Sequence, residues 1–145
     1  MAYELPPIAK LAERLHLNIE QAVRNFPRYH KYAIGKDMRK QARKIVRLCH
    51  RAWRDRGQQL KWVDALVWAI DELKLSLQMG SQIKAFKSFA QFEGLIRLGE
   101  EIGKQAGGWK RQLIQHPKGQ NSTRNAAAER AQILSTCAAS TGANL

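Results

Sequence analysis

Basic side chains recur at helical spacing along residues 36–54, where they could bind a polyanion. At about 100° per residue, all eight of them fall within an arc of roughly 140° on a helix. They are Lys36, Arg39, Lys40, Arg43, Lys44, Arg47, Arg51 and Arg54. The apolar residues of the segment take the opposite side: Met38, Ala42, Ile45, Val46, Cys49, Ala52 and Trp53. We expect the apolar side to pack on a core and the basic side to bind phosphate, which the planar arginine fork suits.

The alternative is a solvated helix surface that has no ligand. Surfaces that serve only solubility usually mix charge signs, because opposite charges four residues apart attract each other. Here like charges repeat at that spacing, as in Lys36–Lys40 and Arg43–Arg47. Each such pair costs a few tenths of a kcal/mol in an isolated helix. The repetition therefore favours a polyanionic partner.

The segment before this helix extends the positive charge. Arg28, His30 and Lys31 lead into it, and we predict that they join the eight as nucleic-acid or partner-binding residues. Tyr29 and Tyr32 alternate with them. The two tyrosines either stack on unpaired bases or pack across the turn between two helices.

The composition of the whole chain agrees with a polyanionic partner. The 145 residues include 25 Lys and Arg against 12 Asp and Glu, a formal net charge of +13. Such a charge attracts DNA, RNA or an acidic membrane face. The sequence contains no apolar run of about 20 residues, so we expect no membrane span. Its first ten residues lack the apolar run of a signal peptide, and a cytoplasmic location is expected.

No constellation of residues typical of catalysis, metal binding or cofactor binding is present. Cys49 and Cys137 form no CxxC pattern, which argues against a zinc site or a disulfide framework and fits a reducing compartment. Glu13 and His16 form an E-x-x-H, but a di-iron bundle needs a second one and further carboxylates. The glycines match neither a P-loop nor a dinucleotide-binding fingerprint. We therefore expect no catalytic residue, no metal and no cofactor, and a protein that is not an enzyme.

The spacing of apolar residues predicts an all-α, antiparallel four-helix bundle. The first helix runs from Ile8 to about Phe26 and ends before Pro27, with a possible break at residues 16–18. Residues 28–35 form a connection, and the basic helix follows from Lys36 to about Arg56, stopped by Gly57.

Two further helices complete the predicted bundle. The third has a seam of apolar residues at steps of three and four, namely Val63, Leu66, Ile70, Leu73, Leu77 and Gly80. The fourth begins at a capping box formed by Ser88 and Gln91 and continues to about Trp109. Residues 1–114 thus form one domain. Residues 115–145 form a polar tail that we expect to be flexible, with a nascent helix at most over residues 125–134.

Three glycines of the fourth helix lie on one helical stripe because they are spaced by four residues. Gly99, Gly103 and Gly107 would let another helix approach closely, either within the bundle or between subunits. They are our candidates for contacts in a homo-oligomer.

Several short segments, in this order and at this spacing, resemble a known family of small bacterial four-helix-bundle proteins. The segments are Phe26–Gly35 (FPRYHKYAIG), Asp71–Lys74 (DELK), Phe89–Glu93 (FAQFE) and Glu101–Trp109 (EIGKQAGGW). The similarity covers roughly residues 5–114. One branch of the family is Avd, the accessory variability determinant of diversity-generating retroelements. The other is the intervening-sequence protein encoded within some bacterial ribosomal RNA genes.

The strong positive charge makes the chain more similar to the Avd branch. This resemblance implies a homopentameric barrel of four-helix bundles that works with an error-prone reverse transcriptase and its template RNA or cDNA. It also implies a non-catalytic subunit, because catalysis belongs to the polymerase. Two alternatives stay open: an intervening-sequence-type bundle with another RNA role, and a structural oligomer whose basic face meets an acidic protein.

Overall fold

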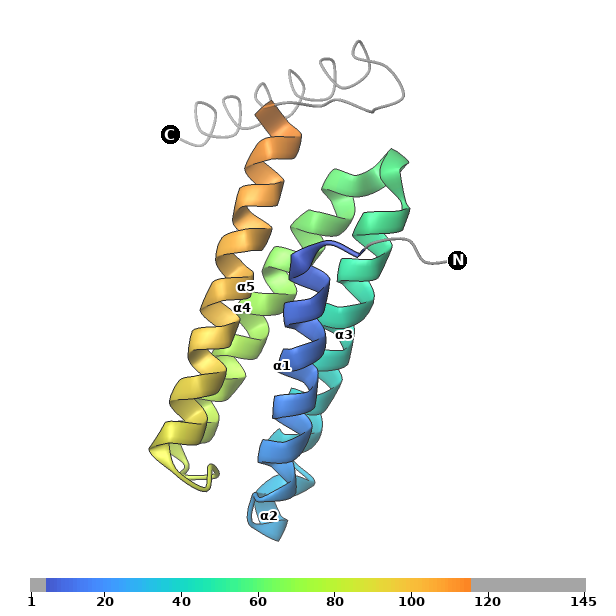
Figure 1. The fold of residues 1–145 in the computed structure, drawn as a ribbon. Helices are drawn as coiled ribbons and strands as arrows, with labels where there is room; N and C mark the ends of the chain where they lie inside the picture. Colours follow the sequence, from blue (N-terminus) through green and yellow to red (C-terminus); the bar gives the residue numbers. More distant parts are fainter. Residues whose placement is uncertain (1–4, 116–145) are drawn as a thin grey trace, which may run out of the picture.

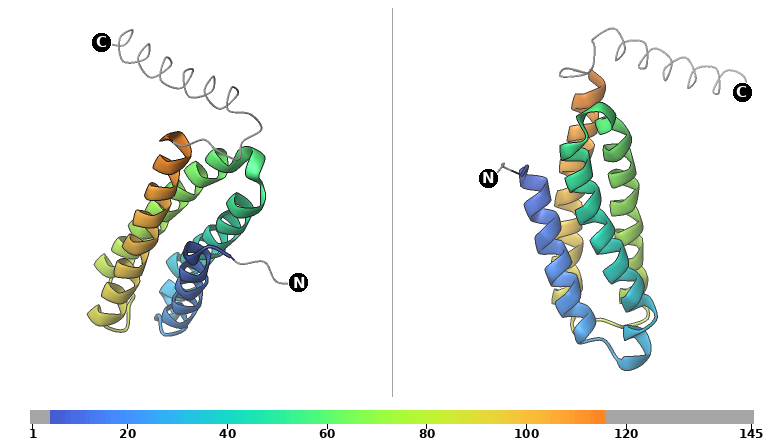
Figure 2. Two further views of the ribbon diagram at one scale, coloured as in Figure 1. Left: turned by 45° about the horizontal axis from the view of Figure 1, so that its top comes forward. Right: turned by 90° about the vertical axis from the view of Figure 1, so that its right-hand side faces the viewer.

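Four long helices lie side by side and run antiparallel, each joined to the next by a short connection (Figure 1). This computed structural model describes residues 5–115. The helices are α1 (Pro7–Arg24), α3 (Ile34–Arg54), α4 (Gln59–Gln82) and α5 (Phe89–Gln115). Each helix packs on two neighbours: α3 contacts α1 and α4, and α5 contacts α4 and α1 (Figure 2). The prediction of an all-α bundle is confirmed, and the predicted flexible tail lies outside the described residues.

The core lies along the central axis and is formed by the apolar stripes of all four helices. Its largest fully buried side chains are Leu15, Ile19, Met38, Ile45, Val63, Leu66, Ile70, Leu73, Leu77 and Ile102. Burial of such side chains is worth about 1.5–3 kcal/mol each. The prediction that Val46 and Trp53 of α3 lie in the core was wrong, because both are only half-buried. Leu48, which was not among the predicted core residues, is buried. The true buried arc is rotated toward α4, which brings Val46 and Trp53 to the edge of the interface.

The first helix is continuous, so the possible break at residues 16–18 does not occur. Pro7 occupies the first turn, where a missing N–H costs nothing. Leu15 and Ile19 are both fully buried and anchor the backbone on either side of that segment. The helix ends at Arg24, and Phe26 then turns into the core.

The connection predicted over residues 28–35 contains structure that the sequence did not indicate. A one-turn helix, α2 (Arg28–Lys31), follows Pro27, whose carbonyl accepts hydrogen bonds from His30 N and Lys31 N, both at 2.9 Å. Helix α3 begins at Ile34, so Gly35 is its second residue. A Cβ on Gly35 would lie 2.7 Å from Val23 Cγ1, so α1 and α3 approach closely at this point.

The basic helix ends at Arg54, before Gly57, and the predicted glycine stop is wrong. Gly57 lies in a short 3₁₀ turn, η1 (Arg56–Gln58). Side chains close the helix end instead. Asp55 leaves the helical conformation, and its Oδ2 accepts a hydrogen bond from Trp62 Nε1 at 2.9 Å. The side-chain amide of Gln59 donates a hydrogen bond from Nε2 to the Ala52 carbonyl at 2.9 Å.

The α4–α5 connection combines two capping devices. Lys84 has a left-handed φ of 59°, and Ala85 N donates to the Gly80 carbonyl at 2.9 Å, which closes the end of α4. At the start of α5, Gln91 N donates to Ser88 Oγ at 3.2 Å as predicted. The Gln91 side chain accepts from Lys87 N, rather than from Ser88 N as a full capping box requires.

Candidate nucleic-acid interface

The eight predicted cations of α3 lie together on its outer surface, which is flanked by α1 and α4. Six of these residues are exposed: Lys36, Lys40, Lys44, Arg47, Arg51 and Arg54. Arg39 and Arg43 are half-buried on the side that faces α1. The opposite side of α3 carries Met38, Ala42, Ile45 and Cys49, which anchor the helix in the core. We call the eight cations the α3 basic face.

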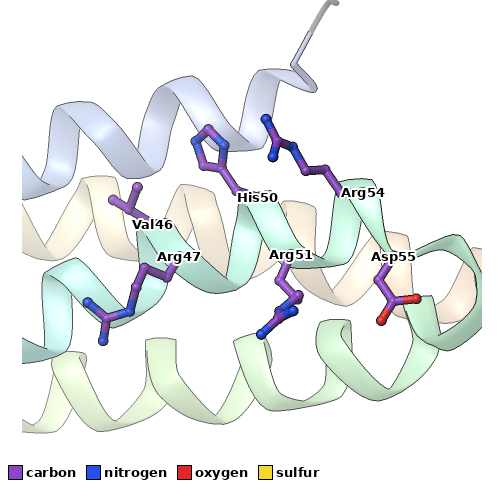
Figure 3. Close-up of a pocket in the computed structure, with 6 residues that line it drawn as sticks. All are labelled: Val46, Arg47, His50, Arg51, Arg54 and Asp55. Carbon is purple, nitrogen blue, oxygen red and sulfur yellow. The ribbon is translucent and has the colours of Figure 1, made fainter.

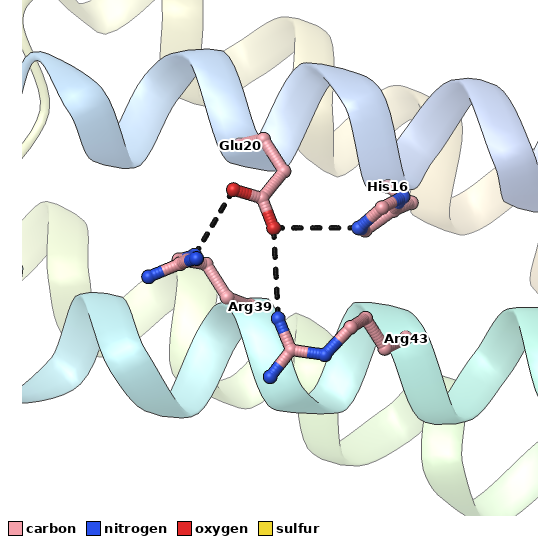
Figure 4. A network of polar contacts seen from close by, with 4 residues as sticks. All are labelled: His16, Glu20, Arg39 and Arg43. Carbon is pink, nitrogen blue, oxygen red and sulfur yellow. Dashed lines mark hydrogen bonds and ion pairs between the residues drawn. The ribbon is translucent and has the colours of Figure 1, made fainter.

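A carboxylate from α1 borders this face. Arg39 Nε donates to Glu20 Oε1 at 3.0 Å, and Arg43 Nη1 lies 3.6 Å from Glu20 Oε2 (Figure 4). His16 Nε2 is 3.3 Å from Glu20 Oε2, although not in hydrogen-bonding geometry. Two turns earlier on α1, Glu13 Oε2 lies 3.2 Å from His50 Nε2 of α3. The sequence analysis did not predict the contacts of Glu20 and Glu13 with α3. The only signal in the sequence was that the two glutamates are seven residues apart and so lie on the same side of α1.

Four other cations of the α3 basic face have no such counter-charge. Within residues 5–115, Lys36, Lys40, Lys44 and Arg47 make no ion pair with a carboxylate. Like charges at this spacing repel one another along the helix. A line of exposed cations therefore remains positive, as the sequence predicted.

A shallow hollow lies at the C-terminal end of the face. It is lined by Val46, Arg47, His50, Arg51, Arg54 and Asp55 (Figure 3). In Figure 3, Arg47 and Arg51 point toward α4, whereas His50 and Arg54 point toward α1. The Arg51 guanidinium carbon lies 4.9 Å from the centre of the Trp62 ring of α4. The hollow thus combines several cations with an aromatic support.

The α2 residues lie at the opposite end of the bundle from this hollow (Figure 1). Arg28 is exposed there, and His30 and Lys31 are half-buried. Tyr29 and Tyr32 are 82% and 69% exposed, so the alternative that they pack across the turn is wrong. Both rings are accessible to a ligand.

The glycine stripe of α5 faces α4 within the same chain. A Cβ on Gly99 would lie 3.3 Å from Lys74 Cγ, and one on Gly103 would lie 3.7 Å from Ile70 Cγ2. Gly107 lies further along, where a Cβ would meet only Arg111. Close approach within the bundle is therefore one use of these glycines, and a contact between subunits stays a prediction.

A second apolar stripe, on the outer side of α4, was not predicted. Trp68, Leu75 and Met79 are 67%, 57% and 43% exposed. Their spacing of seven and four residues places them on one face, opposite the buried seam of Leu66, Leu73 and Leu77. Their type and spacing were visible in the sequence, but the stronger seam had already accounted for the helix.

The remaining candidate groups are structural. Burial and the nearby Glu13 carboxylate raise the pKa of the Cys49 thiol from 9.0 to about 12, so the thiol stays protonated in the core. Among residues 5–115, no group of three or more His, Cys, Asp and Glu side chains could hold a metal ion. None of the helices in this part of the chain has the length and apolar character needed to cross a membrane.

Comparison with known proteins places the chain in a family. A search of curated protein sequences finds no significant match. The model of the bAvd-like family, which includes the accessory variability determinant Avd, matches residues 8–113. This match covers α3 and α4 completely and nearly all of α1 and α5. Members of the family are accessory and in general non-catalytic proteins of diversity-generating retroelements, and the chain belongs to this bAvd-like family.

Proposed function

We propose that the chain binds the template RNA or cDNA of a diversity-generating retroelement along the α3 basic face and docks the reverse transcriptase during mutagenic homing. The observation that carries this proposal is the line of Lys36, Lys40, Lys44 and Arg47, which have no carboxylate partner within residues 5–115. Phosphates would supply the missing counter-charge. Arg28, His30 and Lys31 of α2 extend the line beyond the start of α3.

The length of the face suits a nucleic-acid strand. From Lys36 to Arg54 the helix rises about 27 Å, at 1.5 Å per residue. Phosphates of one strand in a duplex follow each other about every 3.4 Å along the axis. The face can therefore meet several phosphates at once, and such contacts hold a strand without reading its sequence.

The chemistry of the reaction belongs to the polymerase in this proposal. The chain needs no catalytic residue, metal or cofactor of its own, and it acts in the cytoplasm beside its partners. Its task is to hold the template strand close to the enzyme.

The chain would work as a homo-oligomer, a pentamer according to its family resemblance. The outer α4 stripe of Trp68, Leu75 and Met79 supports this part of the proposal, because exposed apolar stripes of this kind usually meet another protein. Several copies would align their α3 basic faces and multiply the number of phosphate contacts.

The experiment that tests the proposal is a salt titration of RNA and DNA binding by the full chain, with reverse transcriptase binding measured on the same variants. In the variant Lys44→Glu/Arg47→Glu, affinity should fall about tenfold or more and the salt slope should flatten by about two, because two phosphate contacts are lost. A matched control, Lys84→Glu/Lys104→Glu, changes the net charge equally at exposed positions away from α3. Circular dichroism should show both variants folded.

The outcomes separate the alternatives. Equal losses in the two variants would mean that net charge, and not the α3 basic face, attracts nucleic acid. Unchanged RNA binding together with lost reverse transcriptase binding would favour an acidic protein as the partner of the face. Strong binding of ribosomal RNA with no reverse transcriptase binding would favour an intervening-sequence-type role.

A further inference from the structure

We propose that the hollow at the C-terminal end of α3 is a subsite for an unpaired nucleotide, whose base stacks on the Arg51 guanidinium while its phosphates lie against Arg47 and Arg54. This inference rests on the proposed function, because it assigns a form of nucleic acid to one end of the same face. It adds a preference for unpaired over paired strands.

The first observation is the support beneath Arg51. Its guanidinium carbon lies 4.9 Å from the centre of the Trp62 ring, within the range of a cation–π contact. The Lys61 Nζ also lies 5.0 Å from this ring centre. Most exposed arginines sample many rotamers, but a guanidinium held over an indole has a defined plane. Trp62 thus supports the guanidinium from the α4 side, and Arg51 as a whole is exposed.

The second observation is that Trp62 is itself fixed. Its Nε1 donates a hydrogen bond to Asp55 Oδ2 at 2.9 Å, and the ring is half-buried against the core. Asp55 ends α3. In the same turn, the Gln59 side-chain Nε2 donates a hydrogen bond to the Ala52 carbonyl at 2.9 Å. The indole is therefore held at the α3–α4 corner by a hydrogen bond and by packing, and it can position Arg51 before any ligand arrives.

The third observation is the lining of the hollow beside this plane. Arg47 and Arg51 point toward its α4 side, and His50 and Arg54 point toward its α1 side (Figure 3). Val46 contributes an apolar wall. Arginine guanidinium groups bind phosphate, and a flat base stacks on a guanidinium plane. A nucleotide combines both features in one unit, whereas an Asp or Glu side chain offers only the charge.

The preference for an unpaired strand follows from geometry. Inside a duplex, each base has both faces covered by its neighbours in the stack, so it cannot lie on a protein side chain. An unpaired base is available to aromatic rings and arginine planes, and such stacking is sequence-tolerant because every base has a flat face. A template that is being copied has unpaired nucleotides next to its duplex region.

The test measures the full chain against three probes of equal length: a single-stranded RNA, the same strand annealed to its complement, and a strand of abasic nucleotides with the same phosphates. The wild type should bind the abasic strand about fivefold or more weakly than the intact single strand, because stacking energy is lost. Arg51→Lys keeps the charge but removes the plane. It should weaken binding of the intact single strand by the same factor and leave duplex and abasic binding within about twofold.

Arg47→Lys is the matched control, since it makes the same change in the same hollow but not over Trp62. It should retain the preference for the intact single strand. If Arg51→Lys weakens all three probes equally, or if Arg47→Lys abolishes the preference as well, the stacking subsite is refuted while the α3 basic face stands. If the wild type binds none of the probes, the proposed function fails and this inference fails with it.

Discussion

Glu20 of α1 and Arg39 of α3 are joined by a hydrogen bond of 3.0 Å between Glu20 Oε1 and Arg39 Nε. The same carboxylate lies 3.6 Å from Arg43 Nη1, so one acidic side chain contacts two of the cations predicted to bind phosphate. Both arginine side chains therefore reach toward α1. A phosphate that reaches them must compete with Glu20.

Removal of this competitor should strengthen nucleic-acid binding. In Glu20→Gln the two arginines keep their places but lose an opposing charge, and RNA affinity at low salt should rise about two- to fivefold. The cost in folding stability should stay below about 1 kcal/mol, because the pair is partly exposed. Fluorescence anisotropy with a labelled RNA measures the change. Glu100→Gln, an exposed carboxylate on α5, is the control, and an equal rise there would show an effect of net charge alone.

The tight contact between α1 and α3 predicts a specific stability defect. Gly35→Ala should destabilise the fold by about 1–3 kcal/mol, because its Cβ would lie 2.7 Å from Val23 Cγ1 and 3.1 Å from the His30 carbonyl oxygen. Gly94→Ala on α5 is the control, since its Cβ would meet nothing within 4 Å. There the substitution should stabilise by about 0.5–1 kcal/mol. Denaturant unfolding measures the free energy of unfolding of both variants. If Gly35→Ala left it unchanged, α1 and α3 would have to be able to move apart.

The elevated pKa of Cys49 predicts that this thiol is inert. In a Cys137→Ala variant, native protein should resist alkylation at pH 8.5 and react once unfolded, because the reactive form is the thiolate. The pKa rises from 9.0 to about 12 on folding, so the neutral thiol favours the folded state. Its contribution to stability is complete below about pH 9 and is lost as pH rises toward 12. Rapid alkylation of the native protein would contradict the burial of Cys49.

The outer α4 stripe predicts where copies of the chain meet. The wild type should be a stable homo-oligomer by light scattering, with the mass of a pentamer expected. Trp68→Lys should give smaller species without loss of helicity, because Trp68 is 67% exposed in the single chain. Leu17→Lys on α1, at a residue that is 63% exposed, should leave the assembly intact. A monomeric wild type, or an unaffected Trp68→Lys variant, would count against this surface.

Periodicity was sufficient to predict the bundle, because the four helices bury stripes that can be read within one helix at a time. The seam of Leu66, Ile70, Leu73 and Leu77 and the cations of α3 belong to this class. Features that depend on another helix were missed. Glu20 and Arg39 are far apart in sequence, and the end of α3 depends on Trp62 and Gln59 of α4.

Local rules also failed where a tertiary contact decided the outcome. Gly57 was expected to stop α3, yet Asp55 ends the helix with the help of Trp62. Gly35 was expected in a connection, yet it lies in α3 where Val23 packs against the backbone. Leu48 replaces Val46 in the core because α3 is rotated toward α4, and the spacing of apolar residues cannot fix a rotation of that size.

The up-and-down course of the helices has a practical consequence for handling the protein. The start of α1, the α3–α4 corner and the end of α5 all lie at one end of the bundle, beside the hollow of Arg47, Arg51 and Arg54 (Figure 1). A fusion partner joined directly at Leu5 or directly after Gln115 would therefore lie at the end that we expect to receive the strand. For surface-based measurements, a single biotin on a cysteine that replaces the exposed Lys87 of the α4–α5 turn, in a Cys137→Ala background, would tether the molecule by the other end and leave the hollow facing the solution.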